Sequence, residues 1–167
     1  MSDDPQRAEA LQLWVDGGRL IQAGRFDAAI VILTRSIEIY PTAEAYTFRG
    51  WAYSHLDRVD EAIAECKRAI EVDPTFGNPY NDIGAYLIQQ GRPDEAIPWL
   101  ERATQAERYE ARQFPWANLG RIYAARGERS RAIECFRKSL EEQPGYPVAV
   151  QMLERLVAGL NGFAHLT

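Results

Sequence analysis

Apolar residues recur along this chain at the spacing of amphipathic α-helices, most clearly between residues 113 and 146. One helical stripe in this stretch is formed by Trp116, Leu119, Gly120 and Tyr123. A second stripe follows, in which Ala132 and Phe136 lie one turn apart. Gly127 separates the two stretches, and Pro144 ends the second one. The pattern predicts a hairpin of two helices whose apolar stripes face each other.

The same hairpin pattern occurs four times. A column of small residues on the first helices contains Gly17, Gly50, Gly84 and Gly120. A column on the second helices contains Ala29, Ala62, Ala96 and Ala132, and the turns between them carry Gly24, Asp57, Gly91 and Gly127. Successive members of each column are 33, 34 and 36 residues apart. Because small residues let two helices approach closely, these columns predict a helical repeat array.

The fourth hairpin matches the tetratricopeptide pattern W-x2-L-G-x2-Y…A-x3-F…P at each of its positions, and the whole of residues 10–146 resembles four tetratricopeptide repeats. We predict an extension of the first helix at 1–9, repeats at 10–42, 43–76, 77–112 and 113–146, a capping helix at 147–160 and a loose tail at 161–167. The resemblance implies an all-α fold, a right-handed superhelical solenoid of antiparallel helix pairs. It also implies that the first helix of each pair lines the concave side.

The third unit departs from the pattern in two ways. Arg108 stands where the other units have a closing proline, and the segment 106–112 makes the unit longer. Either the preceding helix runs on or the loop bulges, and a binding role and a neutral one are both open for this segment. Pro98 falls inside a predicted helix, where it should remove one backbone hydrogen bond and bend the helix slightly.

The candidate binding residues are the first-helix residues that point away from the partner helix. At about 100° per residue, these are the groove positions of each unit, and the candidates among them are Trp14, Phe48, Trp51, Asn81, Asp82, Asn118 and Arg121. The row begins aromatic and becomes rich in amides. Aromatic rings would contact apolar side chains of a ligand, and carboxamides can donate to and accept from a peptide backbone. Asn118 resembles a member of the asparagine ladder in the repeats of O-linked N-acetylglucosamine transferase, whereas in the third unit Asp82 stands at that position and Asn81 lies one residue earlier. Alternatively, the tryptophans pack against the next unit and the asparagines bond to neighbours or to water.

A more specific site of the family is the carboxylate clamp that holds the C-terminal tails of heat-shock chaperones. It requires lysine, arginine and asparagine at defined first-helix positions. In one register this chain offers Trp14, Gly18, Phe48, Asn78 and Asp82. In the other it offers Thr47, Trp51, Asp82, Phe114 and Asn118. Neither set contains the cations that would hold a carboxylate, so we predict no chaperone carboxylate-clamp ligand.

Charge and composition exclude several classes of function. A net charge of −5, with no cluster of basic residues longer than two, argues against nucleic-acid binding. No apolar run reaches the roughly 18 residues of a membrane span, and the acidic start of the chain lacks the pattern of a secretory signal, so we expect a cytoplasmic protein. Cys66 and Cys135 are expected to be buried and reduced, and with His55 and His165 they form no metal-binding spacing. No cofactor is predicted.

No catalytic motif occurs in the sequence, which predicts a protein that is not an enzyme. We predict a protein–protein interaction module, an adaptor or scaffold that binds an extended peptide or a partner helix in the concave groove. The alternative is a self-assembling scaffold, such as a homodimer, that uses the groove or the C-terminal helix. The C-terminal helix distinguishes the two hypotheses. If its residues Val150, Leu153 and Val157 all cover the fourth unit, the helix is a cap. If some of them are exposed, the helix offers a docking surface.

Overall fold

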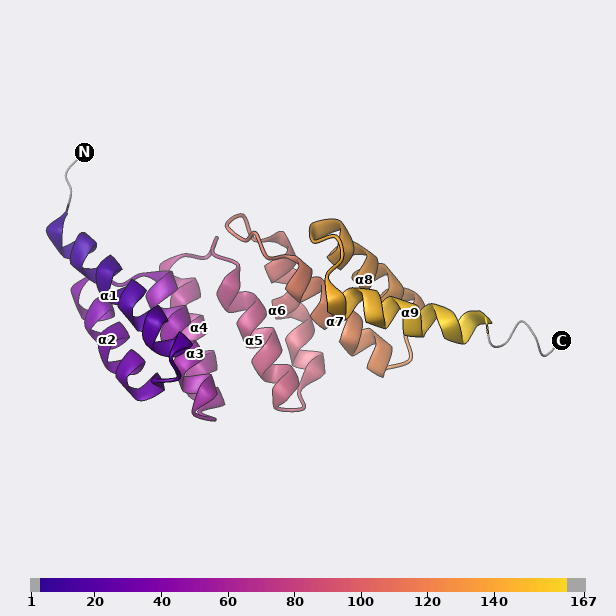
Figure 1. The fold of residues 1–167 in the computed structure, drawn as a ribbon, viewed down its shortest axis with the longest axis horizontal. Helices are drawn as coiled ribbons and strands as arrows, with labels where there is room; N and C mark the ends of the chain where they lie inside the picture. Colours follow the sequence, from indigo (N-terminus) through magenta and orange to yellow (C-terminus); the bar gives the residue numbers. More distant parts are fainter. Residues whose placement is uncertain (1–3, 162–167) are drawn as a thin grey trace.

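The computed structural model describes residues 4–161, which form four helical hairpins and a final single helix (Figure 1). The helices are α1 (Pro5–Gln22), α2 (Phe26–Ile39), α3 (Ala43–His55), α4 (Val59–Val72), α5 (Asn78–Gln89), α6 (Pro93–Gln105), α7 (Gln113–Ala125), α8 (Arg129–Glu142) and α9 (Pro147–Asn161). Pro98 lies inside α6, as predicted. Residues 4–161 contain no β-strand, so the predicted all-α architecture is confirmed.

The hairpins stack in sequence order along the long axis of the molecule (Figure 1). In addition, α1, α3, α5 and α7 contact one another in succession. The second helices of the hairpins have at most sparse contacts with each other within residues 4–161. Elements that approach more closely lie on the inner side of a curved stack. The first helices therefore form the concave side, and α2, α4, α6 and α8 form the convex side.

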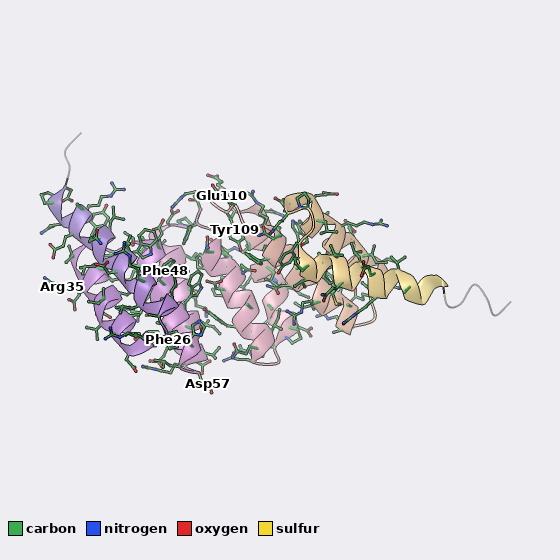
Figure 2. The ribbon with its side chains drawn as sticks, viewed as in Figure 1. Phe26, Arg35, Phe48, Asp57, Tyr109 and Glu110 are labelled. Atoms are coloured by element: carbon green, nitrogen blue, oxygen red, sulfur yellow. The ribbon has the colours of Figure 1, made fainter. Side chains whose placement is uncertain are left out.

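Small residues permit the close crossing of helices inside each hairpin. A Cβ atom added to Gly84 would lie 2.4 Å from Cδ2 of Leu100, and one added to Gly120 would lie 2.8 Å from Cζ of Phe136. Both neighbouring side chains are fully buried, so neither has room to withdraw. The residues at the turns inside the four hairpins, Gly24, Asp57, Gly91 and Gly127, all adopt a left-handed backbone conformation. Asp57 does so without being a glycine, with φ of 61°, at the tip of the α3–α4 hairpin (Figure 2).

The first and last described helices differ in their terminal contacts. Asp4 caps α1 by accepting a hydrogen bond from the backbone N of Gln6 at 3.1 Å, as expected for a helix that begins at a proline. At the other end, Leu153 of α9 packs against the cluster around the buried Phe136, whereas Val157 is 40% exposed. The helix thus caps the fourth unit and leaves part of its apolar face at the surface. Most of the predicted tail, residues 162–167, lies outside the described residues.

A charged pair lies in the core of the second unit. Nε of Arg49 on α3 donates to Oε2 of Glu65 on α4 at 2.7 Å, and the two residues are only 9% and 4% exposed. Arg49 also donates to Thr34 Oγ1 on α2 at 3.0 Å, and Arg68 reaches the other oxygen of Glu65 at 2.9 Å. The pair therefore joins three helices, and each charge is matched by hydrogen bonds.

The segment 106–112 is a bulged loop between α6 and α7, and α6 does not run on through it. Arg108 forms two backbone hydrogen bonds with the loop 75–77, at 3.0 and 3.1 Å, and its guanidinium binds Glu44 at 2.6 Å. Tyr109 is 5% exposed and packs over Gly77. Figure 2 shows Tyr109 and Glu110 at the edge of the array opposite to Asp57. The loop is therefore fastened to the preceding unit.

Replacing Gly77 with alanine should weaken this attachment. The added Cβ would lie 2.3 Å from Cβ of the buried Tyr109, so the loop must shift to accept it. We expect the free energy of unfolding in urea to fall by about 1–2 kcal/mol. Gly18→Ala is the control, because its Cβ would meet the edge of the Phe48 ring at 3.0 Å and no backbone. Equal losses for the two variants would contradict this account of the loop.

Candidate functional site

The predicted aromatic residues of the first two units lie together on the concave side. The rings of Trp14 on α1 and Phe48 on α3 have centroids 5.3 Å apart, and Phe48 stacks on Trp51 at 4.8 Å. Gly18 on α1 leaves the space that the Phe48 ring occupies. Phe48 lies where α1 and α3 meet (Figure 2). All three rings are partly exposed, so they pack between units and also offer an apolar surface.

Polar residues continue the row toward the C-terminus. Nε1 of Trp51 donates to Oδ2 of Asp82 at 2.5 Å, which links α3 to α5. Nδ2 of Asn118 donates to Oδ1 of Asn81 at 3.2 Å, which links α5 to α7. Asn81 and Asp82 are consecutive residues of α5, so the two bonds meet there. Six of the seven predicted site residues therefore form one connected row from α1 to α7, which we call the concave row: Trp14, Phe48, Trp51, Asn81, Asp82 and Asn118.

The carboxylate of Asp82 is the one acidic group in the concave row. Burial raises its pKa to about 7, although hydrogen bonds from Trp51 and Asn81 stabilise the charged form and oppose the rise. Within residues 4–161, no lysine, arginine or histidine forms an ion pair with it. A partly buried carboxylate without a cation is costly to the free protein, because its charge has lost water and gained no counter-charge.

Arg121, the seventh predicted residue, does not join this row. It is exposed on α7 and forms no ion pair within the described part of the chain. His55 lies one turn beyond Trp51 on α3, where its ring stacks on Phe26 at 4.5 Å. The structure thus places both residues beside the concave row, at its margin.

Exposed apolar side chains extend the concave row at both ends, at groove positions of the first helices that are not among the seven candidate residues. Leu11 and Val15 on α1 are 41% and 38% exposed, and Phe114 on α7 is 41% exposed. Phe114 also meets Tyr146 edge to face, with ring centroids 5.7 Å apart. The sequence indicates that these three residues face the groove, because they occupy the first-helix positions that point away from the partner helix.

The two cysteines have the environment of core residues. Cys66 and Cys135 are buried and free, and burial raises the pKa of the Cys135 thiol to about 11. A thiol with a raised pKa is a weak nucleophile, which matches the predicted core role. Within the described residues, no group of three or more histidine, cysteine, aspartate or glutamate residues is placed to hold a metal ion. Over the same residues, every helix is too short or too polar to cross a bilayer.

Three sequence models described as tetratricopeptide repeat match residues 43–76, 65–97 and 114–146, which together make up just over half of the chain. This chain is a tetratricopeptide repeat protein. Members of the family are in general protein–protein interaction modules, and the chain belongs to that class. Because helical repeats serve unrelated partners, the family alone does not decide what this tetratricopeptide repeat protein binds.

Two relatives show the range of the sequence similarity. The type IV pilus assembly protein PilF of Pseudomonas aeruginosa is 28% identical over 159 residues, which are 93% of this chain and 63% of PilF. The small glutamine-rich tetratricopeptide repeat-containing protein 2 of Mycosarcoma maydis is 31% identical over 105 residues, 62% of this chain and 30% of that protein. The chain therefore spans between about a third and two thirds of these relatives.

Solved structures confirm the solenoid fold. Pseudomonas aeruginosa PilF superimposes with a TM-score of 0.88 at 23% identity, over 96% of this chain and 73% of PilF. MamA has a TM-score of 0.71 at 25% identity, over 87% of this chain and 84% of MamA. YrrB, described as a tetratricopeptide repeat protein with an unusual peptide-binding site, has a TM-score of 0.68 at 20% identity, over 95% of this chain and 80% of YrrB. At these identities the first and third similarities show the fold alone.

Proposed function

We propose that this protein is an adaptor that holds an extended segment of another protein along the concave row. The observation that carries the proposal is the continuity of the row, in which aromatic and polar groups follow one another across four neighbouring helices and all but the buried Asn81 are partly exposed. An extended segment loses water from its backbone when it binds, so its amides need partners. Asn118 offers a carboxamide for such a bond, while Phe48 and Trp51 offer apolar area.

The similar proteins support this class of activity without placing it in one cellular setting. YrrB is described as having a peptide-binding site, and PilF as a pilus assembly protein. One description names the binding of a peptide and the other names the assembly of a pilus, so the two differ in the setting. We therefore propose the mode of binding and leave the setting open.

The proposal is tested with peptides on beads, screened against the full chain. Peptides of about twelve residues span roughly 40 Å when extended, which is long enough to cross several helices. We expect Asn118→Ala/Arg121→Ala to bind the selected peptides about tenfold more weakly than the natural chain, a loss of roughly 1.4 kcal/mol. The measurement is fluorescence anisotropy with the labelled peptide.

A matched variant controls for the loss of one amide and one cation. Arg137 and Gln143 are exposed on and just after α8, on the convex side, and neither belongs to the concave row. Arg137→Ala/Gln143→Ala should bind as the natural chain does. If the library gives no binder, or if the two double variants bind equally well, the concave row is not the binding site.

A second candidate function is self-association through α9. It is favoured by Val157, which is 40% exposed on a helix whose opposite face covers the fourth unit. Light scattering across a range of concentrations tests it: a dimer that Val157→Glu converts to a monomer would support self-association. A monomer at every concentration would remove it.

A further inference from the structure

We infer that the carboxylate of Asp82 recognises a lysine or arginine side chain of the bound segment, and that an apolar residue next to that cation lies against Phe48 and Trp51. This inference rests on the proposed function, since it names the chemistry of the segment that the concave row holds. It is the reverse of a site for a terminal carboxylate, because here the protein supplies the anion.

The position of Asp82 is the first argument. It lies on α5, inside the concave row, with Trp51 of α3 on one side and Asn81 next to it in the chain. Nε1 of Trp51 donates a hydrogen bond to the carboxylate and so holds it in place. A carboxylate can accept about four hydrogen bonds, so capacity is left for an ammonium or a guanidinium. Asp82 is half-buried, so part of the residue lies at the concave surface, from which a ligand side chain can approach it.

The comparison with Glu65 is the second argument. Both residues are carboxylates withdrawn from water, but Glu65 is held by two arginines at 2.7 and 2.9 Å. Asp82 has no such partner within residues 4–161. The fold thus neutralises one withdrawn carboxylate internally and leaves the other one on the concave face. A cation from outside would supply the missing counter-charge.

The groups around Asp82 do not provide that charge. Cys66 on α4, Tyr86 on α5 and Tyr109 on the 106–112 loop are titratable groups whose charged forms the Asp82 charge disfavours, and burial raises the pKa of each. All three are therefore neutral at neutral pH. His55 on α3 stacks on Phe26, and Arg121 on α7 is exposed at the margin of the row. Neither of them forms an ion pair with Asp82.

The aromatic neighbours favour the same ligand. The stems of lysine and arginine are apolar and pack well on rings, while their charged heads are attracted to the face of an indole. Trp51 is stacked on Phe48 and bonded to Asp82, so one ligand side chain could contact an indole and the carboxylate together. An acidic side chain would instead meet the Asp82 charge and be repelled.

The test uses the bead library with N-acetylated, C-amidated peptides, so that no free terminal amine can replace the side chain. The best binder is resynthesised with its lysine or arginine replaced by norleucine, which keeps an apolar stem and removes the charge. We expect the natural chain to bind the norleucine peptide about tenfold more weakly. Asp82→Asn should bind both peptides with equal affinity, and Glu71→Gln, which removes an exposed charge from α4, should behave as the natural chain does.

Two further outcomes separate recognition from support of the fold. Asparagine can still accept the bond from Trp51, so Asp82→Asn keeps the contact and loses only the charge. Trp51→Phe keeps the charge and loses the bond, and it should retain the preference for the cationic peptide. If Asp82→Asn keeps that preference, Asp82 does not recognise the cation. Selected peptides that bind without any basic residue would overturn this inference and leave the proposed function standing. A library without binders would remove both.

Discussion

Replacing Arg49 with methionine should lower the free energy of unfolding by about 3 kcal/mol, because it leaves Glu65 as a charged group in the core without its main partner. Glu65 is 4% exposed, so water cannot take the place of the guanidinium. The substitution also removes the hydrogen bond to Thr34, which joins α2 to this network. Unfolding in urea, followed by circular dichroism at neutral pH, measures the loss.

Two companion variants show whether the loss comes from the stranded charge. Arg49→Met/Glu65→Met replaces both charges by flexible apolar side chains and should recover most of the stability. Arg68→Met removes the second partner of Glu65. The Arg68 side chain is 57% accessible, so its loss should lower the free energy of unfolding by less than about 1 kcal/mol. A double variant as unstable as Arg49→Met would mean that packing, and not charge, explains the loss.

Replacing Asp82 with asparagine should stabilise the protein at alkaline pH and do so progressively less as the pH falls. The folded-state pKa of Asp82 is raised from 3.8 to about 7, so between these values the folded protein retains a proton that the unfolded chain has released. Stability from this group is therefore fully present below the unfolded pKa and is lost as the pH rises through 7. Asparagine does not titrate, so the variant does not lose this stability as the pH rises.

The size of this effect follows from the shift and from the exposure of the carboxylate. Each pKa unit corresponds to 1.36 kcal/mol, and partial contact with water reduces the total, so we expect the advantage of Asp82→Asn to grow by about 2 kcal/mol between about pH 5 and pH 8. Urea unfolding at a series of pH values measures it. Asp27→Asn serves as the control, because it makes the same substitution at an exposed aspartate of α2. A constant difference between Asp82→Asn and the natural chain would show that burial does not perturb the carboxyl group.

The architecture was predictable because it depends on local periodicity. The columns of glycine and alanine report helix crossings that recur in every unit, and Gly84 indeed admits Leu100 where the column places it. The first-helix stripe likewise predicted which side chains share the concave face. The sequence resolved these features because each rests on spacing along one helix.

Other features depend on pairings between helices, which spacing along one helix does not reveal. Arg49 occupies a position that faces the partner helix, where the third and fourth units have Ile83 and Leu119, and this exchange of charge for apolar side chain was a visible signal. Its partner Glu65 could be found only by knowing which turns of α3 and α4 meet. The bond between Trp51 and Asp82 is of the same kind, since it crosses from one repeat to the next.

The ion pair between Arg108 and Glu44 bears on how the array comes apart. A repeat stack in which each unit contacts only its neighbours can open from either end, one unit at a time. Arg108, in the loop before α7, instead reaches the first turn of α3, and it also binds Asp73. The second and third units share this fastening, whereas no ion pair joins the first unit to the rest of the array within residues 4–161. Amide hydrogen exchange should therefore be fastest in α1 and α2 and uniformly slow from α3 to α6, so that the molecule opens as an independent N-terminal flap on a cooperative block.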